Sequence, residues 1–353
     1  MSSWESYVRK VVPYVPGEQP QEQHMIKLNT NENPYPPAPG VKKVLEEMEA
    51  DRLRKYPDPT ASILVKELAS YYGLNEDQVF VGVGSDDVLA MSFLTFFNSD
   101  KPVLFPDVTY SFYKVWADLF KVPFETPVLK EDFTIDVKDY EKENGGVIFP
   151  NPNAPTGVYM PLDQVEEILK ANQDVVVIVD EAYVDFAGPS ALELLDKYEN
   201  LLVVQTFSKS RSMAGMRIGF AMGHPNLIRA LNNVKYSYNS YTMNLPSLLA
   251  GVEAVKDKAY FESTLAKIVA TRERSKKRLA ELGFTFPDSR SNFIFASHES
   301  VPAEKIFEAL KKEQIYVRYF KTPGLDNSLR ISIGTDEEMD TLFRFLEAYL
   351  PNA

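Results

Sequence analysis

The sequence predicts an α/β protein, with a large domain built on a mostly parallel sheet between helices and a smaller α+β domain. Continuous apolar runs such as residues 175–180 (VVVIVD) and 201–206 (LLVVQT) show no in-out alternation, which is typical of strands covered on both faces. Helical patterns such as residues 161–170 (PLDQVEEILK) separate these runs, as crossover helices between parallel strands do. Ligands of such sheets bind beyond the carboxyl ends of the strands, so polar residues there are the candidates for function.

The size and composition of the chain exclude several classes of protein. The 353 residues are 44% hydrophobic, enough for about two domains. The lack of cysteine excludes disulfides and thiol catalysis, and the three scattered histidines argue against a zinc site. A net charge of -12 argues against binding to nucleic acid or to an anionic membrane. The sequence has no apolar run of membrane-spanning length, so we expect a soluble, cytoplasmic protein.

The first part of the chain combines an irregular arm with the expected large domain. Residues 1–40 are rich in proline and form the arm. Short helical patterns follow at 41–50 and 60–72, the second of which ends at Gly73. The domain of residues 41–260 then takes its strands from apolar runs, which are QVFVGV, PVLF, GVIFP, VVVIVD, LLVVQT and RIGFAM.

The last part of the chain is the expected small domain. A long helical pattern from 244 to 282 would join the two domains. Residues 261–353 continue with three strand patterns (SNFIFA, IYVRYF and LRISIG) and two helical ones (AEKIFEALKKE and EEMDTLFRFLEAYL). We expect the N-terminal arm to pack against this domain.

Lys209 is the first candidate for chemistry, in the segment TFSKSRSMAGMRIGF of residues 206–220. Ser208 precedes it directly, and Arg217 begins the next apolar run. A half-buried lysine beside hydroxyls and an arginine suits Schiff-base formation with a ligand that also carries an anion. Taken alone, the segment favours a strand-turn-strand whose lysine points to solvent and whose Ser208 caps a turn.

Asp180 ends the run VVVIVD, where a buried carboxylate is costly without a cation or a hydrogen-bond donor. A protonated pyridine nitrogen is one such cation, and Tyr183 is close enough in sequence to reach the same ligand. A turn or helix-capping aspartate is the alternative. Glu181 and Asp185 extend the acidic group, but no further ligand spacing favours a metal.

The segment GVGSDD of residues 82–87 follows a strand and begins a helix. Gly84 permits a tight turn, and the amides after it, with Ser85 and Asp86, can surround a phosphate. The same glycines imitate a dinucleotide-binding motif, but Asp87 stands where the third glycine belongs. A plain strand-to-helix turn is the other interpretation.

Three further residues are candidates because of their place in the chain. Tyr110 follows the strand PVLF and could stack on a flat ring. Asn153, in the turn-rich NPNAPTG, offers a donor at the mouth of the sheet. Arg330 alternates with the apolar side chains of LRISIG and can bind a carboxylate or a phosphate, although a surface salt bridge is the more common role.

Together and in this order, GVGSDD, NPNAPTG, VDEAY, SKSRSMAGMRIGF and LRISIG resemble the fold-type I aminotransferases, which use pyridoxal 5'-phosphate. The resemblance implies that Lys209 bonds the cofactor's aldehyde and that Asp180 pairs with its ring nitrogen. Tyr183 would hold the ring hydroxyl, Tyr110 would stack on the ring, and Arg330 would bind the substrate's anion. The residues expected around the cofactor phosphate are Gly84, Ser85, Asp86, Thr206, Ser208 and Arg217.

Within that family the chain is most similar to the histidinol-phosphate aminotransferases, through KLNTNENPYPP, VVPY, RKYPDP and LRISIGT. This similarity implies transfer between histidinol phosphate and glutamate or 2-oxoglutarate in histidine biosynthesis. It implies that Tyr14 contacts the substrate, and Asn33 is a further candidate for substrate binding. A doubly charged phosphate should need donors beyond Arg330, and we expect Arg211 or Tyr14 to supply them. It also implies a homodimer in which Tyr56 reaches the cofactor phosphate of the neighbouring subunit.

One position departs from the family pattern, which has asparagine before Pro-Thr-Gly as a donor to the ring hydroxyl. This chain has Ala154 there, so either Asn153 takes the role or Tyr183 carries it alone.

Other functions remain compatible with parts of the sequence. An aromatic amino-acid aminotransferase could accept a flat ring in place of imidazole, and a decarboxylase of similar fold would release carbon dioxide. The glycine motif alone favours a nicotinamide-dependent dehydrogenase. A protein that binds the cofactor without turnover would have little need of Lys209.

Overall fold

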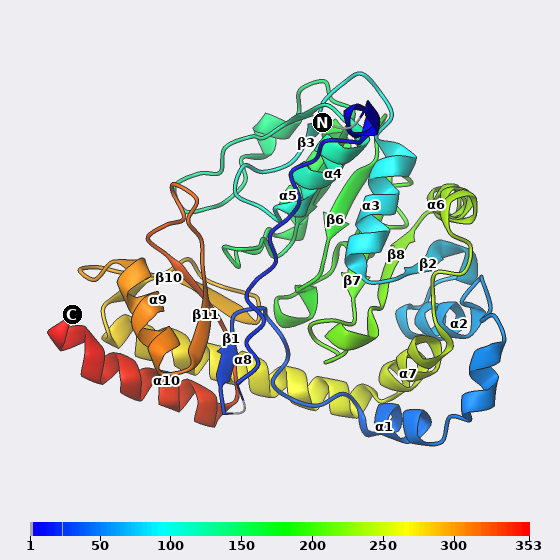
Figure 1. Ribbon diagram of the computed structural model, residues 1–353. Coiled ribbons are helices and arrows are strands. Elements are labelled where there is room, and N and C mark those ends of the chain that lie inside the picture. Colours follow the sequence, from blue (N-terminus) through cyan, green and yellow to red (C-terminus); the bar gives the residue numbers. More distant parts are fainter. Residues whose placement is uncertain (1–2, 23) are drawn as a thin grey trace.

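The computed structural model describes residues 3–22 and 24–353 and shows a large and a small sheet, each with its own helices (Figure 1). The sheets contain seven and five strands among the described residues. The predicted α/β class is confirmed. Among the described helices, none has both the length and the apolar character that crossing a membrane requires.

The large sheet is parallel except for one strand. In spatial order its strands are β2 (Val79–Gly82), β8 (Gly219–Gly223), β7 (Leu201–Thr206), β6 (Val177–Asp180), β5 (Gly146–Pro150), β3 (Val103–Leu104) and β4 (Phe124–Glu125). Strand β8 runs antiparallel to both of its neighbours. The central strands are buried along their whole length, as their continuous apolar runs predict.

Helices cover both faces of this sheet. Along β6, Val177 and Val179 belong to one core cluster and Ile178 to another, because successive side chains of a strand point to opposite faces. The helices packed on the Val177 side are α2 (Ser62–Tyr72), α5 (Leu162–Ala171) and α7 (Leu245–Lys256). Those on the other side are α3 (Ser85–Phe96), α4 (Phe112–Phe120) and α6 (Pro225–Tyr238). Helix α1 (Pro39–Glu46) packs on α7.

The small sheet includes a strand from the N-terminal arm. Its strands, in spatial order, are β1 (Ile26–Leu28), β11 (Ile315–Tyr319), β12 (Leu329–Ser332), β10 (Phe293–His298) and β9 (Phe284–Thr285). Its helices are α8 (Lys258–Glu281), α9 (Ala303–Lys312) and α10 (Asp336–Tyr349). Strand β1 pairs with β11 in parallel, so this part of the arm belongs to the small sheet. The earlier part of the arm lies on the large domain, contrary to expectation, because Arg9 donates to the Leu119 carbonyl and Tyr14 stacks on Phe112, both in α4 (Figure 1).

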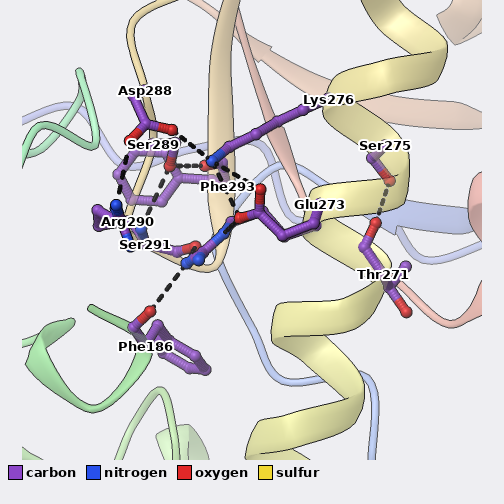
Figure 2. A network of polar contacts seen from close by, with 11 residues as sticks. Phe186, Thr271, Glu273, Ser275, Lys276, Asp288, Ser289, Arg290, Ser291 and Phe293 are labelled. Atoms are coloured by element: carbon purple, nitrogen blue, oxygen red, sulfur yellow. Dashed lines mark hydrogen bonds and ion pairs between the residues drawn. The ribbon is translucent and has the colours of Figure 1, made fainter. Parts of the chain in front are cut away.

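Helix α8 connects the two sheets, with Arg272 buried at its middle. The Arg272 guanidinium donates to the carbonyl oxygens of Phe186, in the large domain, and Ser291, just before β10. One turn on, Lys276 pairs with Asp288 (Figure 2). The predicted helix of residues 244–282 is broken at Asp257, which caps α8. The expected domain boundary, between residues 260 and 261, falls in the first turn of α8.

Candidate active site

A cavity of about 340 Å³ lies where three parallel strands of the large sheet end. Pro150, Asp180 and Thr206 are the last residues of β5, β6 and β7, and all three line it. The opposite wall comes from the arm and from the small sheet, through Tyr14, Thr30 and Arg330 among others. The cavity therefore occupies the place where ligands bind in such sheets.

Lys209 reaches into this cavity from the turn that follows β7. Its Nζ donates a hydrogen bond of 3.0 Å to the carbonyl oxygen of Thr30, and it lies 5.7 Å from the centre of the Tyr183 ring. The backbone around it is held by Asn33, whose side-chain amide donates to the carbonyl oxygens of Lys209 and Ser210. The lysine thus faces a ligand site and not bulk solvent.

Asp180 is a buried carboxylate without a cation. Its oxygens accept hydrogen bonds from the Tyr113 hydroxyl at 2.8 Å and from the Ala182 amide at 3.2 Å. Burial raises the pKa of the Asp180 carboxyl to about 6. In residues 3–22 and 24–353, no lysine, arginine or histidine forms an ion pair with it, although it lines the cavity. A cationic nitrogen on a ligand would supply that partner.

The amino end of α3 and the residues after β7 form a site for an anion. Helix α3 begins at Ser85, and no side chain caps its first turn, so its free amides can bind negative charge. Ser85, Thr206, Ser208 and Arg217 all line the cavity. Gly84 has a φ of +86°, and a Cβ there would lie 2.4 Å from Nη2 of Arg217. Only glycine therefore allows the arginine to approach the helix this closely.

Tyr110 lines the cavity beside this anion site. Its hydroxyl donates to a carboxylate oxygen of Asp86 at 2.7 Å, and the other oxygen of Asp86 lies 3.4 Å from Arg217. Burial, together with the charge of Asp86, raises the pKa of Tyr110. The phenol therefore stays neutral, and its hydrogen bond to Asp86 holds the ring at the cavity wall.

Arg330 and Arg318 form the cationic wall at the small sheet. They are directly opposite each other in the antiparallel pair of β12 and β11, and both line the cavity. Nη2 of Arg330 donates to the carbonyl oxygen of Asn29 at 3.2 Å, while its buried Nε has no hydrogen-bond partner among the described residues. Burial, with the like charge of Arg318, lowers the pKa of Arg330. An anion of the ligand would satisfy both guanidinium groups.

Arg211 requires a correction, because its side chain does not enter the cavity. It is 6% exposed, and its Nη1 donates to the carbonyl oxygen of Ala254 at 2.9 Å. Its guanidinium packs on the rings of Tyr71, Phe207 and Phe261, the last at 4.3 Å. The guanidinium of Arg211 is thus held by protein groups, and Arg211 is not among the residues that line the cavity.

Two asparagines also lie elsewhere than expected. Asn33 is not among the residues that line the cavity, and its amide holds the Lys209 turn. The Asn153 amide donates to the Val108 carbonyl and to the Thr156 hydroxyl, so it serves its own loop. Ala154, directly after it, is the residue of this loop that lines the cavity.

Tyr14 and Tyr56 differ in position. Tyr14 lines the cavity and stacks on Phe112 with ring centres 4.2 Å apart. Tyr56 is 82% exposed and contacts the Tyr241 ring, outside the cavity of its own chain.

The sequence interpretation missed Arg318, Tyr113 and Asn31. Arg318 alternates with apolar residues in IYVRYF as Arg330 does in LRISIG, so the same pattern could have identified it. Tyr113 lies within an ordinary amphipathic helix, and Asn31 acts across the domains, so no local pattern marks either.

Comparisons with known proteins give a consistent result. The family model "Aminotransferase class I and II" matches residues 23–346. A histidinol-phosphate aminotransferase of Brachyspira hyodysenteriae is 52% identical over 345 residues, 98% of either chain. One from Clostridium acetobutylicum is 54% identical over 336 residues, 95% of this chain and 96% of the relative.

Solved structures agree in fold. The crystal structure of a histidinol-phosphate aminotransferase from Clostridium acetobutylicum has a TM-score of 0.86 at 24% identity, covering 93% of this chain and 100% of its own. That of Sinorhizobium meliloti, in complex with pyridoxal-5'-phosphate, has a TM-score of 0.83 at 25% identity, covering 92% and 90%.

Proposed function

The chain belongs to the class I and II aminotransferase family, and from this we propose that it exchanges an amino group between histidinol phosphate and 2-oxoglutarate. The products would be imidazole acetol phosphate and glutamate, a step of histidine biosynthesis. Relatives that share about half of its residues over nearly the whole chain carry that name. The structural observation that carries the proposal is the pair Arg318 and Arg330 facing Lys209 across one cavity.

The cavity fits pyridoxal 5'-phosphate, the cofactor of this family. The uncompensated carboxylate of Asp180 suits a protonated ring nitrogen. The phosphate would be held by the amides at the start of α3 and by four side chains, those of Ser85, Thr206, Ser208 and Arg217. When bound, the cofactor supplies a cationic ring that stabilises negative charge on the substrate carbon.

Lys209 is the residue that we assign to proton transfer. Its primary amine would hold the cofactor at the aldehyde carbon, and the same amine, when free, would take a proton from the substrate carbon and return it. The carbonyl oxygen of Thr30 holds Nζ on the cavity side. Asp180 would keep the ring nitrogen of the cofactor protonated, and Tyr110, which lines the same cavity, would pack against the ring.

The substrate's charge decides which aminotransferase this is. Histidinol phosphate has no carboxylate, and its phosphate is a dianion at neutral pH. Two guanidinium groups side by side match a dianion, whereas one arginine suffices for the carboxylate of an aromatic amino acid. Arg318 thus takes the role expected of Arg211, and Tyr14, which lines the same wall, adds a hydroxyl.

We further propose that the active unit is a homodimer. Tyr56, Tyr236, Tyr238 and Tyr241 are exposed by between 43% and 82%. Tyr236 and Tyr238 lie at the end of α6, and Tyr241, which follows shortly after, contacts the Tyr56 ring. Exposed aromatic groups of this kind are typical of an interface core. The family resemblance places Tyr56 at the cofactor phosphate of the partner subunit.

The test of the substrate assignment compares three amines as donors to 2-oxoglutarate. Histidinol phosphate should exceed its dephosphorylated form, histidinol, by at least about 100-fold in kcat/KM, since only the phosphate uses both arginines. Phenylalanine should be poorer still. If phenylalanine is the best donor, the chain is an aromatic aminotransferase. If carbon dioxide is released, it is a decarboxylase.

A further inference from the structure

The cavity lacks an amide that the family pattern provides. The residue before Pro155 lines the cavity, and here it is Ala154. Its neighbour Asn153 does not take its place, because both of its amide hydrogens serve Val108 and Thr156. Tyr183, which lines the cavity and belongs to the same core cluster as Ala154, is then our candidate donor to the ring hydroxyl oxygen of the cofactor. The inference rests on the proposed cofactor.

A different asparagine, Asn31, contacts Tyr183 and also lines the cavity. Asn31 is 1% exposed, and its Nδ2 donates to the Tyr183 hydroxyl oxygen at 2.9 Å. It comes from the arm, directly after the Thr30 carbonyl that holds Lys209. Its backbone oxygen accepts from the Asn292 side chain at 3.0 Å, so the position of Asn31 is fixed by the small domain.

Ser332 determines which way the Asn31 amide points. The Ser332 hydroxyl oxygen accepts from the Asn31 backbone amide at 2.9 Å, and its proton is directed to Oδ1 of Asn31 at 3.1 Å. With the amide reversed, this hydroxyl would receive two N–H groups and its own proton would have no acceptor. The Nδ2 group therefore faces Tyr183.

The direction of this hydrogen bond controls the Tyr183 proton. A phenol oxygen that accepts from Nδ2 of Asn31 directs its own O–H elsewhere, and the Tyr183 side chain lines the cavity. We propose that Asn31 is a positioning residue that compensates for Ala154, by orienting the Tyr183 hydroxyl to donate to the ring oxygen of the cofactor. The N-terminal arm thereby takes over a task that the family pattern assigns to the loop after β5.

The proposal predicts a change in the bound cofactor itself. A hydrogen bond to the ionised ring oxygen favours the deprotonated form. Removing the Asn31 amide should raise the pH midpoint of the cofactor's absorbance change by about one unit. Cofactor affinity should fall about tenfold. Neither readout requires turnover.

The variants are chosen to separate this role from a structural one. Asn31 has a φ of +56°, so Asn31→Gly removes the amide without backbone strain. Asn31→Asp keeps the size of the side chain, but its carboxylate accepts the Tyr183 proton and so draws it away from the cofactor. This variant should shift the pH midpoint of the cofactor's absorbance change at least as far as Asn31→Gly does. Should the glycine variant not fold, the aspartate variant provides the same test. Asn292→Ala is the matched control, because it loosens the same segment and leaves Nδ2 of Asn31 on Tyr183.

Rescue provides the decisive comparison. Adding Ala154→Asn to Asn31→Gly should restore the midpoint and the affinity, while Ala154→Asn alone should change little. A wild-type midpoint in both Asn31 variants, or a failure of Ala154→Asn to restore it, overturns the inference and leaves the proposed function standing. A wild-type protein that shows no cofactor absorbance at all overturns the proposed function and the inference with it.

Discussion

Arg318 lies directly opposite Arg330 in the antiparallel pair of β11 and β12, and both side chains line the cavity that contains Lys209. Two like charges at paired positions of neighbouring strands repel each other. The structure offers no carboxylate to separate them, since neither arginine forms an ion pair within the described residues. A doubly charged ligand removes this cost, which is why we assign the pair to the substrate's phosphate.

Arg318→Gln should therefore act mainly on the phosphorylated substrate. Loss of a charge-assisted hydrogen bond costs about 1.5–3 kcal/mol, so the KM for histidinol phosphate should rise about 10- to 100-fold. The KM for histidinol, which lacks the phosphate, should change much less. Steady-state kinetics with both amines measure this difference, and an equal loss for both would assign Arg318 to packing.

Arg211→Met should affect stability and leave the phosphate preference intact. The substitution removes the donor to the Ala254 carbonyl and the stacking of a guanidinium on three rings. We expect the free energy of unfolding to fall by about 1–3 kcal/mol. Urea unfolding measures the loss. A selective rise in the KM for histidinol phosphate, with unchanged stability, would return Arg211 to the substrate site.

Asp180 should make the cofactor-free protein sensitive to pH. The folded-state pKa of Asp180, about 6, lies above the ordinary value of 3.8. Its contribution to the free energy of unfolding is therefore fully present below pH 3.8 and is lost as the pH rises through 6. Asp180→Asn abolishes this loss. The stability difference between variant and wild type should grow between pH 4 and pH 7, to about 2–3 kcal/mol. Unfolding of the cofactor-free proteins at several pH values measures it, and a difference that stays constant contradicts the assignment.

Mixed dimers test whether Tyr56 serves the partner's site. Tyr56→Ala and Lys209→Ala should each be nearly inactive. A hybrid of the two has one site with both lesions and one with none. Random mixing should therefore restore about a quarter of the wild-type activity. If mixing restores nothing while the hybrid dimer forms, both residues serve the same subunit's site.

The sequence predicts the large domain well because its strands are buried on both faces. Runs such as VVVIVD and LLVVQT became β6 and β7, and their last residues line the cavity, as the sheet rule requires. The break between α7 and α8 was not predicted. The helical pattern continues through Asp257, and only the capping hydrogen bond to Tyr260 marks the new start.

The sequence predicts those cavity residues whose placement depends on one element, and misses those whose placement depends on two. Lys209, Asp180 and Arg330 follow from their own strands and turns. Arg211 appeared to suit an anion, but whether an arginine faces a cavity or three aromatic rings depends on α2 and α7, which pack around it. The contact of Asn31 with Tyr183 spans 152 positions of the chain and has no local signature.

The most direct test of the central claim follows the absorbance of the protein loaded with pyridoxal 5'-phosphate. Addition of histidinol phosphate without 2-oxoglutarate should convert the cofactor to its amine form in a single turnover, and 2-oxoglutarate should then restore the original spectrum. Phenylalanine at the same concentration should convert the cofactor much more slowly. In the Lys209→Ala variant, histidinol phosphate should convert the cofactor far more slowly than in the wild type. Rapid conversion by phenylalanine with none by histidinol phosphate would contradict the account, as would full conversion by Lys209→Ala.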